Sequence, residues 1–167
     1  MASSLTHKPL PEKFKVPFKI VVQETRHDDA LAAVGTITGK TLAEIWTAAY
    51  KLGLPKAGQY FVSEDLIAKL LIQHGLVSTK WKEFTSFDAI NGVALLWADT
   101  VGDDPEVSGR IIIYHHVRET ADYKAINYCI EIAETDPAKQ IVTNVQRFAP
   151  SSYIDIAPQG KPGDKGK

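Results

Sequence analysis

The sequence contains a single cysteine, Cys129, among its 167 residues. One cysteine cannot form a disulfide within the chain, and no cysteine–histidine pair has the spacing of a zinc site. Because Cys129 stands among apolar residues of a predicted strand, we expect a buried and unreactive thiol. The sequence therefore predicts no disulfide framework, no metal and no other cofactor.

Long apolar runs and an excess of charge of one sign are also missing. No stretch approaches the roughly 20 apolar residues of a membrane-spanning helix, and the N-terminal segment MASSLTHKPLPEKFK lacks the apolar region of a secretory signal. The formal net charge is −1, which favours neither nucleic acid nor an anionic membrane as a partner. These absences predict a cytoplasmic protein that neither binds nucleic acid nor inserts into a membrane.

The remaining composition is that of one globular domain. Hydrophobic residues make up 44% of the chain and charged residues 23%, and 167 residues suffice for a core that folds unaided. The two ends are polar and carry Pro, Gly or Lys. We therefore expect a flexible N-terminal arm over residues 1–15, one domain over 16–157 and a disordered tail over 158–167.

Helix signals fill the first half of the predicted domain. A short β-rich segment, Phe18–Val22, predicts one strand, and three stretches with apolar residues at helical spacing follow it. Each of these helices has a capping residue at its start and a glycine at its end. They begin at Asp28–Asp29, Thr41 and Ser63, and they end near Gly39, Gly53 and Gly75. Thr41 to Glu44 has the pattern of a capping box.

Strand signals dominate the second half. Strands are expected at Gly92–Ala98, Arg110–Val117, 128–132 and 153–156, with an acidic loop at Thr100–Gly109 between the first two. Asp136 and Pro137 predict a helix that continues to Phe148. Helices first and strands later predict an α+β fold, with N-terminal helices packed on one side of a mostly antiparallel sheet formed by the C-terminal half.

The segment QETRHDDALAAVGTITG, from Gln23 to Gly39, joins the first predicted strand to the alanine-rich helix. It resembles the nucleophile segment of the papain-like cysteine peptidases, and within them the bacterial C39-like group. There a Gln precedes an Asp-Cys pair, and a helix of small residues leads to a Thr-Gly. The resemblance places Gln23 at the oxyanion-stabilising Gln, Asp28 at the Asp, and Asp29 at the catalytic Cys.

Two shorter motifs extend the resemblance to roughly residues 16–150. The stretch SGRIIIY is similar to the Gly-His that opens a buried strand in the family, with Arg110 at the position of the catalytic His. Asp136, followed by Pro137, matches the third triad residue, although its spacing from Arg110 is longer than usual. The resemblance implies a papain-like fold with a site that has lost both nucleophile and base.

The two replacements are chemically complementary. The Asp29 carboxylate is a poor nucleophile toward amides, and the Arg110 guanidinium stays protonated and cannot act as a base. Together they can form a bidentate ion pair, so we expect an Asp29–Arg110 pair in place of the Cys–His dyad. The sequence then predicts a catalytically inactive papain-like protein that binds a peptide or protein, with Gln23, Asp28, Asp29, Arg110 and Asp136 as ligand-binding candidates.

Simpler roles remain open for these residues. Asp28 and Asp29 also suit plain helix capping, Arg110 an exposed strand start, and Gln23 a solvated strand end. A metal site built on His27, Asp28 and Asp29 has no supporting spacing. A structural or regulatory protein unrelated to peptidases is a further interpretation.

An active papain-like peptidase or related hydrolase is the alternative function. Its nucleophile would be misaligned or would have been replaced by mutation, for example at Ala30. His115 and His116 are consecutive, so they point to opposite faces of a strand, and either would then be the candidate base. The simultaneous loss of His at Arg110 argues against this alternative, because one replacement does not explain two losses.

Overall fold

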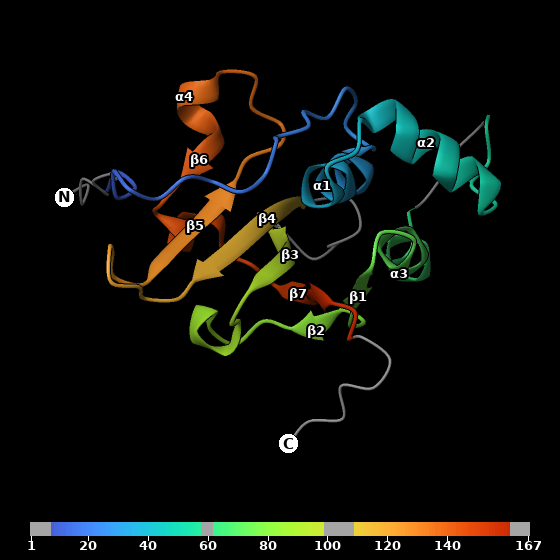
Figure 1. The fold of residues 1–167 in the computed structure, drawn as a ribbon. Helices are drawn as coiled ribbons and strands as arrows, with labels where there is room; N and C mark the ends of the chain where they lie inside the picture. The colour runs from blue at the N-terminus through green and yellow to red at the C-terminus, as the bar shows by residue number, and fades with distance from the viewer. Residues whose placement is uncertain (1–7, 58–61, 99–108, 161–167) are drawn as a thin grey trace.

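The computed structural model describes residues 8–57, 62–98 and 109–160. Of the predicted acidic loop, Thr100–Gly109, only Gly109 belongs to these described residues. The centre of the molecule is an antiparallel seven-stranded sheet with the order β1-β7-β3-β4-β5-β6, in which β2 also pairs with β7 (Figure 1). The strands are β1 Leu76–Ser78, β2 Lys82–Glu83, β3 Val93–Ala98, β4 Arg110–Val117, β5 Ile126–Ile130, β6 Ile141–Val142 and β7 Ser152–Pro158. The predicted α+β class is confirmed.

Three helices precede the sheet in the chain and pack against it: α1 Asp29–Thr38, α2 Leu42–Lys51 and α3 Glu64–Ile72. The predicted caps of the second and third are confirmed. Thr41 and Glu44 form a reciprocal capping box, and the Ser63 hydroxyl accepts from the N–H of Leu66. Helix α1 ends at Gly39, whose left-handed backbone (φ 75°) suits a residue without a Cβ.

Small side chains let α1 lie deep in the core. Its residues from Ala30 to Thr36 are all buried. A Cβ added to Gly35 would stand 2.9 Å from the carbonyl oxygen of Lys40, so a glycine is needed where α1 turns toward α2. Helix α1 contacts β4 as well as α2 and α3 and so joins the helical layer to the middle of the sheet, whereas α3 contacts the sheet at its edge strand β1.

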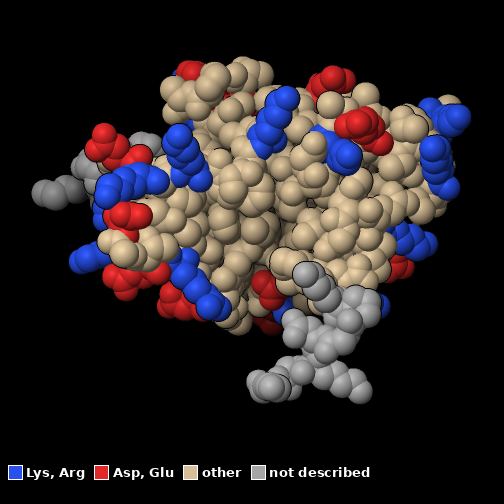
Figure 2. Space-filling model, viewed as in Figure 1, with Lys and Arg blue, Asp and Glu red and all other residues tan. Residues whose placement is uncertain are grey.

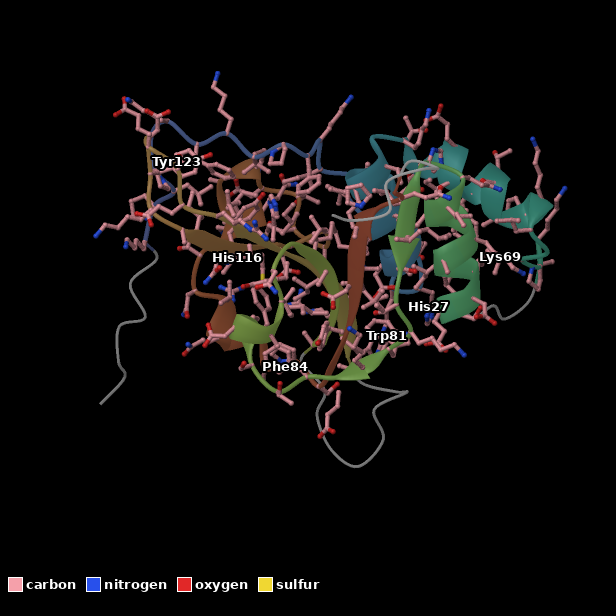
Figure 3. All side chains as sticks on the ribbon, turned by 60° about the horizontal axis from the view of Figure 1, so that its bottom comes forward. His27, Lys69, Trp81, Phe84, His116 and Tyr123 are labelled. Atoms are coloured by element: carbon pink, nitrogen blue, oxygen red, sulfur yellow. The ribbon has the colours of Figure 1, made fainter. Side chains whose placement is uncertain are left out.

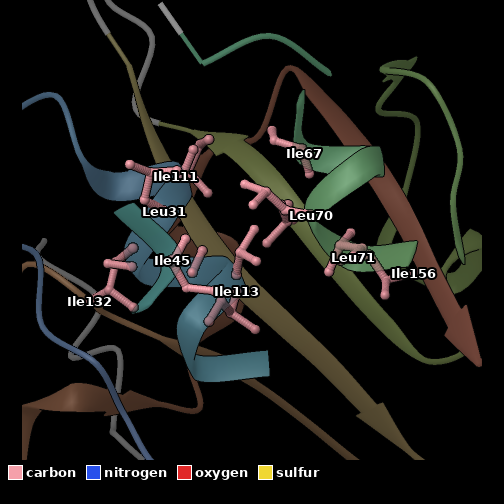
Figure 4. Packing of buried hydrophobic residues seen from close by; sticks show 14 of the residues in the cluster. Leu31, Ile45, Ile67, Leu70, Leu71, Ile111, Ile113, Ile132 and Ile156 are labelled. Carbon is pink, nitrogen blue, oxygen red and sulfur yellow. The ribbon is translucent and has the colours of Figure 1, made fainter. Parts of the chain in front are cut away.

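The two faces of the sheet bury separate cores. Successive residues of a strand point to opposite faces, and Ile111 and Ile113 of β4 accordingly join the core under the helices, whereas Ile112 and Tyr114 join the other. Figure 4 shows the helix-side core, in which Leu and Ile side chains from α1, α2 and α3 meet those of the sheet.

Short turns of helix cover the opposite face. These are the 3₁₀ turns η1 Phe87–Ala89 and η2 Val145–Phe148, while the four-residue helix α4 Pro137–Gln140 contacts β6 at the edge of the sheet. Val145 and Phe148 of η2 pack in the second core with Tyr153 of β7. The sheet is thus covered by long helices on one side and by irregular segments on the other.

Two sequence predictions about elements are wrong. Phe18–Val22 is not a strand: the N–H of Val21 donates to the Thr36 hydroxyl, and that of Gln23 to the Ile132 carbonyl just beyond the end of β5. The helix predicted from Asp136 to Phe148 stops at Gln140, because the next two residues pair with β5 as strand β6. Strands β1 and β2 were not predicted.

Residues 8–23, called the N-terminal segment below, run along the outside of β5 and β6 before reaching α1 (Figure 1). Lys13 forms an ion pair with Asp122, and the Phe14 ring meets that of Tyr123 at 5.5 Å between centroids. The described part of the predicted arm therefore lies against the domain.

Candidate functional site

Asp28 closes the turn that leads into α1. Its side chain is 1% exposed, and its carboxylate accepts hydrogen bonds from the backbone N–H groups of Glu24 and Thr25 at 3.3 and 3.1 Å. Asp28 is the N-cap residue of α1, but its side chain makes no capping hydrogen bond to the helix. The carboxylate therefore fixes the path of the chain before the helix and does not face a ligand.

Asp29 joins α1 to the start of β4. One carboxylate oxygen accepts from the N–H of Ala30 at 2.8 Å, and the other accepts from the N–H of Ile111 at 2.9 Å. Burial raises the pKa of Asp29, the charge of Asp28 adds to the rise, and the two backbone hydrogen bonds oppose it. Both carboxylate oxygens of Asp29 are thus engaged with the protein backbone.

Arg110 points to the opposite face of the sheet from α1. It shares that face with Ile112, and its guanidinium binds the Glu131 carboxylate and lies 5.6 Å from the centre of the Phe148 ring. The prediction of a direct Asp29–Arg110 ion pair is therefore not confirmed. The two residues meet at the same junction, but it is the backbone after Arg110 that Asp29 binds.

Glu131 stands between two guanidinium groups. Its side chain is 8% exposed, and besides Arg110 it has Arg147 of η2 at 3.8 Å. The Arg147 guanidinium also lies over the Phe148 ring, 4.9 Å from its centre. One buried carboxylate and one aromatic ring thus hold two cations in place.

This cluster lines a pocket of about 400 Å³ beside the start of β4. Its walls come from β4, the residues after β5, α4, β6 and η2. The lining residues are Arg110, Glu131, Ala133, Glu134, Ala138, Lys139, Ile141, Val142 and Arg147. Of the candidates singled out from the sequence, only Arg110 lines this pocket.

Gln23 and Asp136 lie near the same end of the sheet but serve local structure. The Gln23 amide donates to the Thr25 carbonyl at 2.9 Å, within the turn before α1. The Asp136 carboxylate accepts from the N–H of Ala138 at 3.0 Å and so caps α4, as its position before Pro137 predicted. Gln23, Asp29 and Arg110 surround the junction of β4 and β5, while their side chains point in different directions.

The histidines and the cysteine lie away from the N-terminus of α1. His115 bonds the Tyr128 hydroxyl at 2.8 Å, and its pKa is lowered by burial and by the neighbouring His116. His116 faces the other way and contacts Asn127. Cys129 is fully buried, and burial raises the pKa of its thiol, so the predicted inert cysteine has the environment expected of one.

No metal site is apparent among the residues that the structure describes. No group of three or more His, Cys, Asp or Glu side chains is placed to hold an ion there. His27 and His116 lie well apart (Figure 3). The hypothetical set of His27 with Asp28 and Asp29 also lacks free carboxylate oxygens, since both acids already accept backbone hydrogen bonds.

The sequence prediction missed Glu131, Lys139 and Arg147. Glu131 carried a usable signal, because it is a lone acid between apolar residues at the end of a strand, and a buried acid needs a cationic partner. Arg147 and Lys139 carried no such signal. They belong to the stretch after Asp136, whose turn and short strand were mistaken for a longer helix.

Charges of both signs are interspersed on the face of the molecule in Figure 2, and no large patch of one sign gathers there. None of the helices in residues 8–57, 62–98 and 109–160 has the length and apolar character needed to cross a membrane. The chain matches no family model, and no curated protein is significantly similar to it in sequence.

Proposed function

We propose that this protein is a non-catalytic binding module for a peptide or protein ligand, a pseudopeptidase of papain-like ancestry. The proposal rests on the resemblance of the 23–39, 108–114 and 136–137 motifs to those of C39-like peptidases. It is supported by the position of Asp29, at the N-terminus of a buried helix that lies against the start of the strand opened by Arg110. A thiolate and an imidazole of an active enzyme would need to meet at such a junction.

The observation that carries the proposal is the hydrogen bond from the Ile111 N–H to the Asp29 carboxylate. It gives the nucleophile position a purely structural task. Arg110 cannot accept a proton, and its guanidinium is held by Glu131 on the far side of the sheet. Cys129, the chain's only thiol, is buried in the sheet.

Binding, in contrast, requires only a surface that offers hydrogen bonds and pockets. The junction provides a polar pocket of about 400 Å³, which is large enough for one or two side chains or a chain end. The pocket is formed by residues from several elements held by a buried carboxylate, so it is largely formed before a ligand arrives.

Screening a peptide library against the purified protein tests the proposal. Fluorogenic peptides and esters measure turnover, and ¹⁵N-labelled protein reports binding through shifts of backbone amides. We expect bound peptides to shift amides around the junction, with no cleavage after prolonged incubation. Cleavage that persists in a Cys129→Ala variant would overturn the pseudopeptidase, and a library without any binder would overturn the peptide-binding module.

A further inference from the structure

We propose that the pocket beside β4, lined by Arg110, Lys139 and Arg147, binds the carboxylate of its ligand. The inference rests on the proposed binding function and names the chemical group that the site recognises. Two sources offer this chemistry, the C-terminal carboxylate of a peptide and a small free carboxylic acid. The pocket's charges, donors and rigidity support the assignment.

The described residues that line the pocket carry more positive than negative charge. Among them Arg110, Arg147 and Lys139 contribute three positive charges, and Glu131 and Glu134 contribute two negative charges. Glu131 is largely buried and already committed to the two guanidinium groups. A singly charged carboxylate would neutralise the remainder, whereas a doubly charged phosphate would bring excess negative charge close to both glutamates.

Arg147 supplies donors suited to a carboxylate. Its guanidinium lies 3.8 Å from the nearest Glu131 oxygen, which is beyond hydrogen-bond range, and its side chain is 51% exposed. Within the described residues no hydrogen bond of that guanidinium is present. A guanidinium carries five N–H donors in a planar fork that matches two carboxylate oxygens, so Arg147 can bind a ligand without releasing Glu131.

The guanidinium groups are also held in place before binding. Phe148 is 1% exposed, and Arg110 and Arg147 both lie over its ring, at 5.6 and 4.9 Å from the centre. Fixing a long side chain in advance reduces the entropy that binding must overcome. Lys139 reaches the same pocket from the end of α4, so the cationic groups come from three separate elements.

The test compares four probes by titration of ¹⁵N-labelled protein: acetyl-trialanine with a free C-terminus, the same peptide as its C-terminal amide, sodium acetate and inorganic phosphate. We expect the free-acid peptide to shift amides between residues 131 and 148. Its affinity should exceed that of the amide at least about tenfold, or about 1.4 kcal/mol. Arg147→Gln and Lys139→Gln should each lower the affinity for the free-acid peptide and leave the affinity for the amide peptide unchanged.

Lys69→Gln is the matched control, because it removes one exposed positive charge from α3, which contributes nothing to the pocket. Arg147→Lys keeps the charge but not the fork, and we expect an intermediate loss. The amide spectrum of each variant outside residues 131–148 reports whether the fold is intact. If Lys69→Gln lowers the affinity for the free-acid peptide as much as Arg147→Gln does, the loss is a general effect of charge and the inference is overturned.

The remaining outcomes separate the inference from the proposed function. Equal binding of free-acid and amide peptides would overturn carboxylate recognition and leave the peptide-binding module standing. If acetate binds as tightly as the free-acid peptide, the pocket recognises a carboxylate, and its ligand is a small free acid and not a peptide C-terminus. Phosphate binding that is tighter than acetate binding would overturn the inference. So would the absence of amide shifts between residues 131 and 148 with every carboxylate probe.

Discussion

Two adjacent acids at the start of α1 have different structural roles. Asp28 is buried and binds the backbone of the preceding turn, whereas Asp29 reaches across to the backbone of β4. An acid at a helix N-terminus commonly satisfies the free N–H groups of that helix. Asp29 does so only for Ala30 and uses its second oxygen to attach the helix to the sheet.

Replacing Asp29 by alanine should destabilise the fold through the Ile111 amide. That N–H would lose its acceptor in a half-buried position, which costs about 1–3 kcal/mol. Urea unfolding measures the loss, and amide exchange at Ile111 should become faster than in the unmodified protein. Glu83→Ala, on the exposed strand β2, is the control and should change the unfolding free energy by less than about 0.5 kcal/mol. Unaltered stability together with unaltered Ile111 exchange would contradict the structural role.

The raised pKa of Asp29 predicts how stability varies with pH. Burial, its main cause, disfavours the charged form in the folded protein, so between the unfolded pKa of about 3.9 and the higher folded value the native state binds more protons. The contribution of Asp29 to stability therefore decreases as pH rises through this window and is constant above it.

Asp29→Asn isolates this contribution, because the amide cannot titrate and still offers one oxygen acceptor. We expect the unfolding free energy of the unmodified protein, relative to that of Asp29→Asn, to fall as pH increases from about 3.9 and then level off. Unfolding by urea over a series of pH values measures the difference. A relative stability that increases with pH across the same window would show that hydrogen bonds outweigh burial at Asp29.

At the scale of elements, the helices were more predictable than the strands because their ends are marked locally. Thr41 and Ser63 are residues of the types that cap helix N-termini, and in the structure each is the N-cap of a helix. A strand forms by pairing with another segment that is often distant in the chain, and a single sequence does not show which segments pair. Thus Ile141 and Val142 stand at helical spacing from Val145 and Phe148, yet they form strand β6 because their backbone pairs with β5.

The candidate residues were easier to choose from the sequence than their orientation. Asp29 and Arg110 were expected to pair through their side chains, but Asp29 binds the backbone N–H of the residue after Arg110. The alternation along β4 also indicates that Arg110 and Ile111 point to opposite faces, but the sequence does not say which face the helices cover. Glu131, the partner of Arg110, lies on another strand's end and could be chosen only once the register of β4 and β5 was known.

The capping box of α2 gives a prediction at the scale of one element. Thr41→Ala removes the hydroxyl that accepts from the Glu44 N–H, and should cost about 1 kcal/mol. Thr47→Ala is the matched control in the same helix, since Thr47 is exposed and bonds only the Ala43 carbonyl within the helix. It should be neutral or slightly stabilising, because alanine favours helix. Equal losses in thermal unfolding would show that Thr41 does not act as a cap.

At the scale of the molecule, β7, the last strand of the described residues, is an inner strand of the sheet. Strand β7 pairs with β3 on one side and with β1 and β2 on the other, so the described fold is incomplete until the C-terminal residues are in place. Its residues also connect the two cores, with Tyr153 on one face and Ile154 on the other. This arrangement predicts one cooperative unit over both layers.

Ile154 and its neighbour Asp155 test that cooperativity. Ile154 is fully buried under the helices, and Ile154→Ala should cost about 2–5 kcal/mol. Asp155 makes a partly exposed ion pair with Lys82, so Asp155→Ala should cost less than about 1 kcal/mol. Urea unfolding followed by tryptophan fluorescence measures both in two backgrounds that each keep one of the three tryptophans, Trp46 on α2 or Trp97 on β3, with the other two replaced by phenylalanine.

If the two layers form one unit, the two signals will change at the same urea concentration, and Ile154→Ala will move both midpoints equally. The reason is that α1 is bound to β4 through Asp29 and to the helix-side core through its buried alanines, so the helices gain little by remaining folded without the sheet. Separate midpoints, with only the Trp97 signal sensitive to Ile154→Ala, would instead show a helical layer that is stable on its own and would divide the predicted single domain.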